Sequence, residues 1–299
     1  MKTRNLLIIL GVLVLGLVVA QLTKKSGKSD VLTGDLVEID TARVTRIQIS
    51  SPDGEVELVA SDKGWEVSLV NGSYKPAKEN SVISLLNDLN SIKPGRLAAR
   101  KEEKWKDFMV DSTGTRVRVY EDDDLTADMV VGRFGMDGQS SYYTFVRPFE
   151  EENVYVAKDF MGITVGKKSA DYRDGLLMRL KRDSITQITF DYPDSAFSLN
   201  KGEKWFLDDV EADSAAVVKY LRGLSYVNSK NFYDGELTSE PTHIITYAFS
   251  NAPEIVVNGY FREGDNLLKT TENDAEVFND STIVSKIFKG KNIFAPTSD

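Results

Sequence analysis

The sequence predicts an α+β protein built from two tandem, duplicated modules behind one N-terminal transmembrane helix. Each module is expected to be a largely antiparallel β-meander with a packed helix and further strands. Three observations support this class. The stretch VTRIQISSPDGEVELVASDKGW (44–65) returns as ITQITFDYPDSAFSLNKGEKW (185–205), the apolar spacing after each copy changes from two residues to a helical period, and the chain opens with a strongly apolar run.

Residues 1–30 are predicted to be a signal anchor followed by a basic linker. Fifteen uninterrupted apolar or Gly residues run from Leu6 to Ala20, after Lys2 and Arg4 and before the lysine-containing stretch 24–28. A helix of about 17 to 25 residues crosses a bilayer, so residues 5–22 are expected to span the membrane. A cleaved signal peptide is the alternative, because this length suits both. Long domains cross membranes largely regardless of flanking charge, so the body is expected outside the cytoplasm.

The two related stretches carry apolar residues at every second position, and these positions match pairwise. A period of two indicates strands with one buried face, so each stretch is expected to form a three-strand meander. The turns at 51–54 and 192–195 both carry Pro at the second position, where its fixed φ is suitable. The matched pairs are Ile47 with Ile188, Ile49 with Phe190, Val56 with Phe197, Leu58 with Leu199, Trp65 with Trp205, and Val67 with Leu207.

A matched amphipathic helix follows each meander. Its apolar residues recur at three-to-four spacing, which forms one stripe that can cover the sheet. Asp213 or Ser214 is expected to cap the second helix. The stripe consists of Val82, Leu85, Leu86, Leu89 and Ile92 in the first copy and Val217, Tyr220, Leu221, Leu224 and Val227 in the second.

Four short β-like runs then follow in each copy, before a final apolar segment that is expected to be helical (159–165 and 282–288). Gly132, Gly135 and Gly138 are expected at hairpin turns. The predicted modules are residues 31–180 and 181–299. The runs are 115–124, 128–134, 141–147 and 153–160 in the first module, and 243–250, 254–261, 266–271 and 276–279 in the second.

These features, together with FMVD before a V-x-V strand, VVG, YTFVR, VYV and the connector SADYRDGLLMRLKRDSITQI (169–188), resemble the domain of unknown function 4340 family over about residues 35 to 295. The resemblance implies a membrane-anchored bacterial envelope protein, in some cases associated with gliding-motility-type ABC transport systems. It carries no catalytic residue over to this chain. We therefore expect a single-pass protein of the bacterial inner membrane with its body in the periplasm.

Several kinds of chemistry are disfavoured by residue type alone. The chain has no Cys, which excludes disulfides and thiolate metal sites, and its net charge of −9 argues against nucleic acid as a partner. His243 is the only histidine and is expected to be an ordinary strand residue, because no nucleophile elbow accompanies it. The carboxylates at 121–124 are expected at a charged hairpin tip, with a hard-cation site as the alternative. No catalytic, metal or cofactor-binding residue is therefore nominated, and no cofactor is expected.

Six basic residues are concentrated in one part of the first copy and have no counterparts in the second. They are expected either to form a surface for an anionic partner, such as lipid headgroups or an acidic polymer, or to lie on a solvated helix. We call residues 93–106 the basic segment. Its cations are Lys93, Arg96, Arg100, Lys101, Lys104 and Lys106.

Six Asp-Ser or Asp-Thr triplets, at Asp40, Asp111, Asp183, Asp194, Asp213 and Asp280, resemble the D-[ST]-apolar O-glycosylation signal of some envelope proteins. The same residue pairs also suit helix caps and turns.

The expected function is that of a non-enzymatic, membrane-anchored extracytoplasmic protein. It would serve as an accessory or scaffold for an envelope assembly, such as an ABC-type transport or motility system, and would have a protein partner in the envelope. The alternative is an extracytoplasmic module that binds a polysaccharide or a similar polymer.

Overall fold

The computed structural model describes residues 36–262 and 264–296. The chain is mostly antiparallel β-sheet, 44% strand against 19% helix, which is an α+β or mostly-β fold. Contacts divide it into two compact units: the first holds the described residues up to Glu55 with Leu85–Gly166, and the second holds Val56–Ser84 with the described residues from Lys167. The boundary between residues 180 and 181 stays a prediction.

The predicted anchor, residues 5–22, lies outside the described residues. Within 36–262 and 264–296, no helix is long and apolar enough to cross a membrane.

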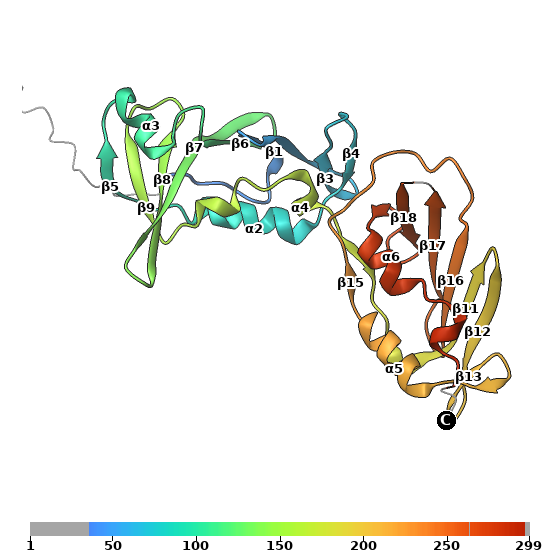
Figure 1. Ribbon diagram of the computed structural model, residues 1–299. Coiled ribbons are helices and arrows are strands. Elements are labelled where there is room, and N and C mark those ends of the chain that lie inside the picture. Colours follow the sequence, from blue (N-terminus) through green and yellow to red (C-terminus); the bar gives the residue numbers. More distant parts are fainter. Residues whose placement is uncertain (1–35, 263, 297–299) are drawn as a thin grey trace, which may run out of the picture. The chain divides into compact units, whose positions relative to one another are not determined.

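The first sheet has nine strands in the order β4-β3-β2-β1-β6-β7-β8-β9-β5 (Figure 1). All four predicted later runs of the first module are strands of this sheet. Its strands are β1 (Val44–Ser51), β2 (Gly54–Ser61), β3 (Gly64–Ser68), β4 (Tyr74–Pro76), β5 (Pro94–Ala99), β6 (Thr115–Glu121), β7 (Asp124–Asp137), β8 (Ser141–Pro148) and β9 (Val154–Lys158).

The second sheet has eight strands in the order β14-β13-β12-β11-β16-β17-β18-β19. A separate pair, β10 (Leu176–Met178) with β15 (Val227–Asn228), lies outside it. The strands of the second sheet are β11 (Ile185–Tyr192), β12 (Ser195–Lys201), β13 (Trp205–Leu207), β14 (Val210–Glu211), β16 (His243–Phe249), β17 (Ile255–Arg262), β18 (Asp265–Thr270) and β19 (Phe278–Asn279).

The helices are short, and the two longest are the predicted amphipathic ones. All ten residues of the two predicted stripes are buried, and seven of them lie on α2 or α5. Ile92 and Leu224 lie just past the helix ends and Val227 lies in β15, so the three-to-four spacing located the buried faces but carried both helices too far along the chain. Asp213 caps α5 by accepting a hydrogen bond from the Ala216 amide at 2.9 Å, and Asp280 caps α6 in the same way. The helices are α2 (Glu79–Asn90), α3 (Trp105–Phe108), α4 (Ser169–Tyr172), α5 (Ser214–Gly223) and α6 (Ser281–Ile287), with single 3₁₀ turns η1 (Glu102–Lys104), η2 (Gly162–Thr164), η3 (Arg182–Ser184) and η4 (Lys291–Ile293).

The matched apolar positions occupy matching places in the two sheets. Leu58 lies opposite Val67 in the β2–β3 pair, as Leu199 lies opposite Leu207 in the β12–β13 pair. Of the twelve matched residues, eleven are buried and Trp65 is half-buried. The sequence expectation that both tryptophans are core residues therefore holds fully for Trp205 only.

Two expectations about local structure are wrong. Gly132 and Gly135 lie inside β7 rather than at turns, and only Gly138 lies in the following turn, with φ of 75°. A Cβ on Gly132 would come within 2.3 Å of the Phe108 carbonyl oxygen, so Gly is required there by close packing. The final segment of the first module forms only the 3₁₀ turn η2, whereas α6 is a helix. Asp159 has a φ of 56° and Gly162 is a poor helix former, so this segment does not continue as an α-helix.

Candidate functional site

The basic segment contains a strand at the edge of the first sheet, so a helix throughout is ruled out. Strand β5 pairs only with β9, with Leu97 opposite Tyr155 and Ala99 opposite Val154. Pro94 disfavours a helix at this point, and the apolar side chains of Leu97 and Ala99 gain contacts on the sheet. Helical structure begins only at η1 and continues into α3.

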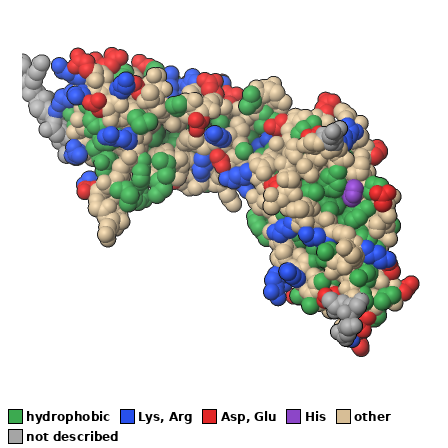
Figure 2. Space-filling model, in the orientation of Figure 1, with side chains coloured by type: hydrophobic (Ala, Val, Ile, Leu, Met, Phe, Trp, Pro, Cys, Tyr) green, Lys and Arg blue, Asp and Glu red, His purple; other side chains and the backbone are tan. Residues whose placement is uncertain are grey.

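All six cations of the basic segment are exposed. Residues 93–106 hold these six basic residues and two acidic ones, Glu102 and Glu103, so the segment has a net charge of 6 − 2 = +4. Lys104 pairs with Asp107 at 3.0 Å. Strand pairing places Ala157 opposite Pro94, so exposed Lys158 lies beside Lys93 and extends the basic surface. Figure 2 shows Lys and Arg side chains at the end of the first unit that carries β5.

Arg147 holds the far end of the basic segment against the sheet. This buried side chain of β8 donates hydrogen bonds to four carbonyl oxygens, including that of Val110 at 3.0 Å and that of Phe149 at 2.6 Å. Its guanidinium also lies over the Trp105 ring, 3.7 Å from the centroid, and Trp105 donates to the Glu152 carbonyl at 3.0 Å. Burial away from water lowers the pKa of Arg147, and the nearby charges of Glu102 and Asp128 only partly oppose this effect. The arrangement fixes α3 in position.

The projecting end of the β7–β8 hairpin carries exposed and half-buried apolar residues on one face of the sheet. Met136 lies opposite Tyr142, and the Phe134 and Tyr142 rings are 6.2 Å apart. Thr144, opposite Phe134, accepts a hydrogen bond from the Gly162 amide at 2.9 Å, which places η2 on this same face. We call this surface the apolar hairpin face. It consists of Phe134, Met136 (61% exposed), Tyr142, Met161 and Ile163 (65% exposed).

The apolar hairpin face and α3 lie on opposite faces of the first sheet. The Phe108 ring of α3 packs 4.5 Å from Phe145, and Phe145 alternates with Thr144 along β8. Figure 2 shows a hydrophobic area beside the hairpin tip. A cluster of exposed apolar side chains commonly marks a binding surface for another protein.

The other sequence-predicted positions have structural roles. Asp122 and Asp123 form the tip of the β6–β7 hairpin, as expected, and Asp122 pairs with Arg43 at 2.6 Å. His243 lies in β16 beside the Tyr192 and Phe261 rings, each 4.8 Å away, and burial lowers its pKa. Across 36–262 and 264–296, no group of His, Asp or Glu side chains is arranged to hold a metal ion.

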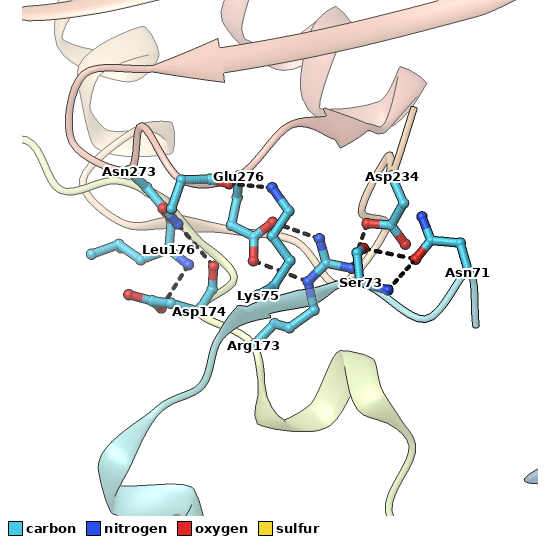
Figure 3. Close-up of polar contacts among 10 residues, drawn as sticks. Asn71, Ser73, Lys75, Arg173, Asp174, Leu176, Asp234, Asn273 and Glu276 are labelled. Atoms are coloured by element: carbon cyan, nitrogen blue, oxygen red, sulfur yellow. Dashed lines mark hydrogen bonds and ion pairs between the residues drawn. The ribbon is translucent and has the colours of Figure 1, made fainter. Parts of the chain in front are cut away.

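The second unit contains a buried ion cluster around Arg173 that the sequence analysis missed (Figure 3). Arg173 is 3% exposed and donates to both carboxylate oxygens of Glu276, at 2.9 and 2.5 Å. It also pairs with Asp234 at 2.8 Å, and its guanidinium lies 3.9 Å from the Phe232 ring centroid. Burial alone would lower the pKa of Arg173, but hydrogen bonds to Glu276 and Asp234 outweigh it and raise the pKa.

Neighbouring contacts join four stretches of the second unit around this cluster. Lys75 of β4 donates to the Ala275 carbonyl at 2.7 Å, and Asn273 donates to the carbonyls of Asp174 and Leu176. Arg173 belongs to the connector 169–188, one of the stretches that carry the family resemblance. Arg173 therefore links the carboxylates of Glu276 and Asp234 within a set of contacts that holds these stretches together.

Comparisons with curated proteins and with solved structures found no match. A family model described as "Domain of unknown function (DUF4340)" matches residues 68–244, which include the basic segment, the apolar hairpin face and Arg173. The chain therefore belongs to the DUF4340 family.

Proposed function

We propose that this protein is a non-enzymatic accessory or scaffold of the bacterial envelope that binds a protein partner through the apolar hairpin face. In this proposal residues 5–22 anchor it in the inner membrane, and its body lies in the periplasm. The observation that carries the proposal is the exposure of Met136 and Ile163 on one face of a well-packed sheet. Large apolar side chains that water surrounds gain free energy when a partner covers them.

The surroundings of the apolar hairpin face support a docking role. Below the exposed side chains the sheet is fixed, because Thr144 is fully buried and donates to the Phe160 carbonyl at 2.7 Å. A rigid surface loses little conformational entropy when it binds, which favours affinity. The resemblance to envelope proteins associated with ABC-type transport or motility systems indicates the class of assembly that would supply the partner.

Purification from the native membrane tests the proposal. The full chain, extracted in mild detergent, is expected to carry a stoichiometric companion that mass spectrometry identifies. Met136→Lys with Ile163→Lys is expected to remove this companion without changing the melting temperature, because both side chains are exposed.

A matched control is available in the second unit. Val210 and Val218 are also exposed, at 60% and 44%, so Val210→Lys with Val218→Lys adds the same charge elsewhere. This control is expected to retain the companion. Absence of any companion from the wild-type protein would contradict the proposal, and specific binding of an envelope polysaccharide by that protein would favour the polymer-binding alternative.

We also propose that the two sheets descend from one copied unit. Support comes from the matched apolar pairs, from the equivalent registers of β2–β3 and β12–β13, and from strand orders that follow the same path from β4 to β8 and from β14 to β18. The Trp65 carbonyl accepts from Ala77, and the Trp205 carbonyl accepts from Ala212, at 2.7 and 2.9 Å. An experimental structure in which the matched residues face non-equivalent strands would contradict common descent.

A further inference from the structure

The described part of the chain begins beside the basic segment. Ile39 exchanges two hydrogen bonds with the side chain of Asn90, each of 2.9 Å, and both Val37 and Ile39 are buried. Asn90 is the last residue of α2, and Lys93 follows three residues later. The polypeptide that connects to residues 5–22 therefore starts next to the first cation of the basic segment.

The connection between the predicted anchor and this point is short. Residues 23–35 are 35 − 22 = 13 residues, and an extended chain spans at most about 3.6 Å per residue, which limits the distance to about 47 Å. Anchorage by residues 5–22 would thus keep the first unit near the bilayer. Tethering raises the effective concentration, so weak individual contacts with the surface are sufficient.

Charge is distributed unequally within and around the basic segment. Lys93, Arg96 and Lys158 lie at the end next to the start of the described chain, whereas the acidic residues Glu102 and Glu103 lie towards α3. With a net charge of −9, the chain as a whole is repelled by an anionic surface. A local cationic area on such a chain therefore favours one orientation at that surface.

The equivalent stretch of the second sheet lacks this property. Residues 229–242, between β15 and β16, contain one basic residue, Lys230, and three acidic ones, Asp234, Glu236 and Glu240. Its net charge is 1 − 3 = −2, against +4 for the basic segment. The cationic surface is thus specific to the unit that continues towards the predicted anchor.

We infer that the basic segment binds the anionic phospholipid headgroups of the membrane that holds the chain. Binding turns the β5 end of the first unit towards the bilayer, while the apolar hairpin face takes the protein partner. This inference rests on the proposed anchorage by residues 5–22. An acidic protein is the other class of anionic partner, and the short connection to the anchor favours lipid.

A single fluorescent label on the full chain tests this inference. The chain has no Cys, so Ser91→Cys creates one labelling site two residues before Lys93, and Asn251→Cys creates one in the turn before β17. Each labelled protein is reconstituted into nanodiscs of phosphatidylcholine alone or with about one third phosphatidylglycerol, and a nitroxide on the lipid headgroup quenches the label. Quenching at position 91 is expected only with phosphatidylglycerol, and about 1 M NaCl should abolish it by screening.

Charge reversal supplies the matched variants. Lys93→Glu, Arg96→Glu and Lys101→Glu together are expected to lower the quenched population at position 91 by about tenfold or more, since each cation near an anionic leaflet favours contact by roughly fivefold. Lys63→Glu, Lys181→Glu and Lys219→Glu change three exposed lysines of the second unit by the same charge and are expected to have no effect.

The outcomes separate this inference from the proposed function. Equal quenching at position 91 in both kinds of nanodisc, with the chain stably inserted, would overturn the inference and leave the anchor intact. Failure of the chain to enter nanodiscs would overturn both. Loss of a co-purified acidic protein in the triple variant, without a change in quenching, would assign the segment to that protein.

Discussion

The first and second sheets connect their strands along the same path, yet the segment after the first helix takes a different course in each. After α2 the chain forms β5, which joins the edge of the first sheet beside β9, and then α3, which packs on that sheet. After α5 the chain forms β15, which pairs with β10 outside the second sheet. The apolar positions that match between the two copies specify the two sheets. The surfaces that distinguish the units lie in segments without such matched positions, here the segment that follows the first helix of each copy.

The interiors of the two sheets also differ in polarity. Where the first has Leu85 and Val119, the matching positions of the second have Tyr220 and Tyr247, whose hydroxyl oxygens are 2.8 Å apart. Each unit also contains a buried arginine over an aromatic ring, Arg147 with carbonyl partners and Arg173 with carboxylate partners. A buried arginine is thus stabilised by neutral carbonyl groups in the first unit and by charged carboxylates in the second.

The largest expected effect comes from Arg173. Arg173→Met leaves the buried Glu276 carboxylate without its cation, which typically destabilises a protein by about 3 to 5 kcal/mol. Arg147→Met leaves only neutral carbonyls without their donor, at a cost of about 1 to 3 kcal/mol. Urea unfolding of both variants measures the difference.

A double variant serves as the control for this comparison. Arg173→Met combined with Glu276→Met removes the charged pair together and is expected to recover much of the stability. An Arg147→Met protein that is less stable than the Arg173→Met protein would contradict our account of the two arginines.

Two strand glycines, one in each sheet, should differ in their tolerance of a methyl group. Gly132 of β7 lies against the Phe108 carbonyl, so Gly132→Ala must displace α3 and is expected to cost about 1 to 3 kcal/mol. Gly259 of β17 lies against the ring ends of Phe261 and Phe288, which can rotate, so Gly259→Ala should cost less. Thermal unfolding of the two variants tests the order, and equal losses would show that α3 is not held as closely as described.

The tyrosine pair of the second sheet offers a finer test. The Tyr220 hydroxyl donates to the Ile287 carbonyl at 2.8 Å, and both Tyr220 and Tyr247 are buried. Tyr247→Phe leaves that bond in place and is expected to cost about 0.5 to 1.5 kcal/mol. Tyr220→Phe removes both bonds and should cost more. The reverse order in urea unfolding would mean that Tyr247, rather than Tyr220, organises the pair.

The smallest expected effect is the pH dependence that His243 adds. Burial among aromatic rings lowers its pKa below 6.5, although Asp194 opposes the shift. As pH falls through about 6.5 the unfolded chain binds a proton before the folded chain does, so the free energy of unfolding decreases. His243→Phe keeps a ring in place and should lose less stability than the wild type between about pH 7 and pH 5. Identical pH profiles would exclude this contribution.

The strands and helices that could be predicted from the sequence are those whose buried face shows in the local spacing of apolar residues. The period of two and the three-to-four spacing each report a buried face directly, so Ile47, Ile188 and the stripe residues within α2 and α5 were placed correctly. Strand β5 was not predicted, because its stability comes from pairing with β9, far along the chain, and PGRLAA shows no alternation of apolar and polar residues.

The ion cluster was missed for a related reason. Arg173 and Glu276 are 103 residues apart, and an isolated charge in a sequence carries no sign of its distant partner. The apolar hairpin face was missed because Met136 and Tyr142 alternate like ordinary half-buried strand residues. Only the structure, through the length of β7, shows that this part of the hairpin extends beyond the elements that cover the rest of the sheet.

Hydrogen exchange of the full chain, measured in its native membrane and again after purification in detergent, tests most directly whether the functional surfaces belong to the first unit. The account predicts slower exchange in the membrane at residues 93–106 and at the tip of the β7–β8 hairpin, with no change at residues 229–242. Slower exchange at residues 229–242, or no change at either surface of the first unit, would contradict it.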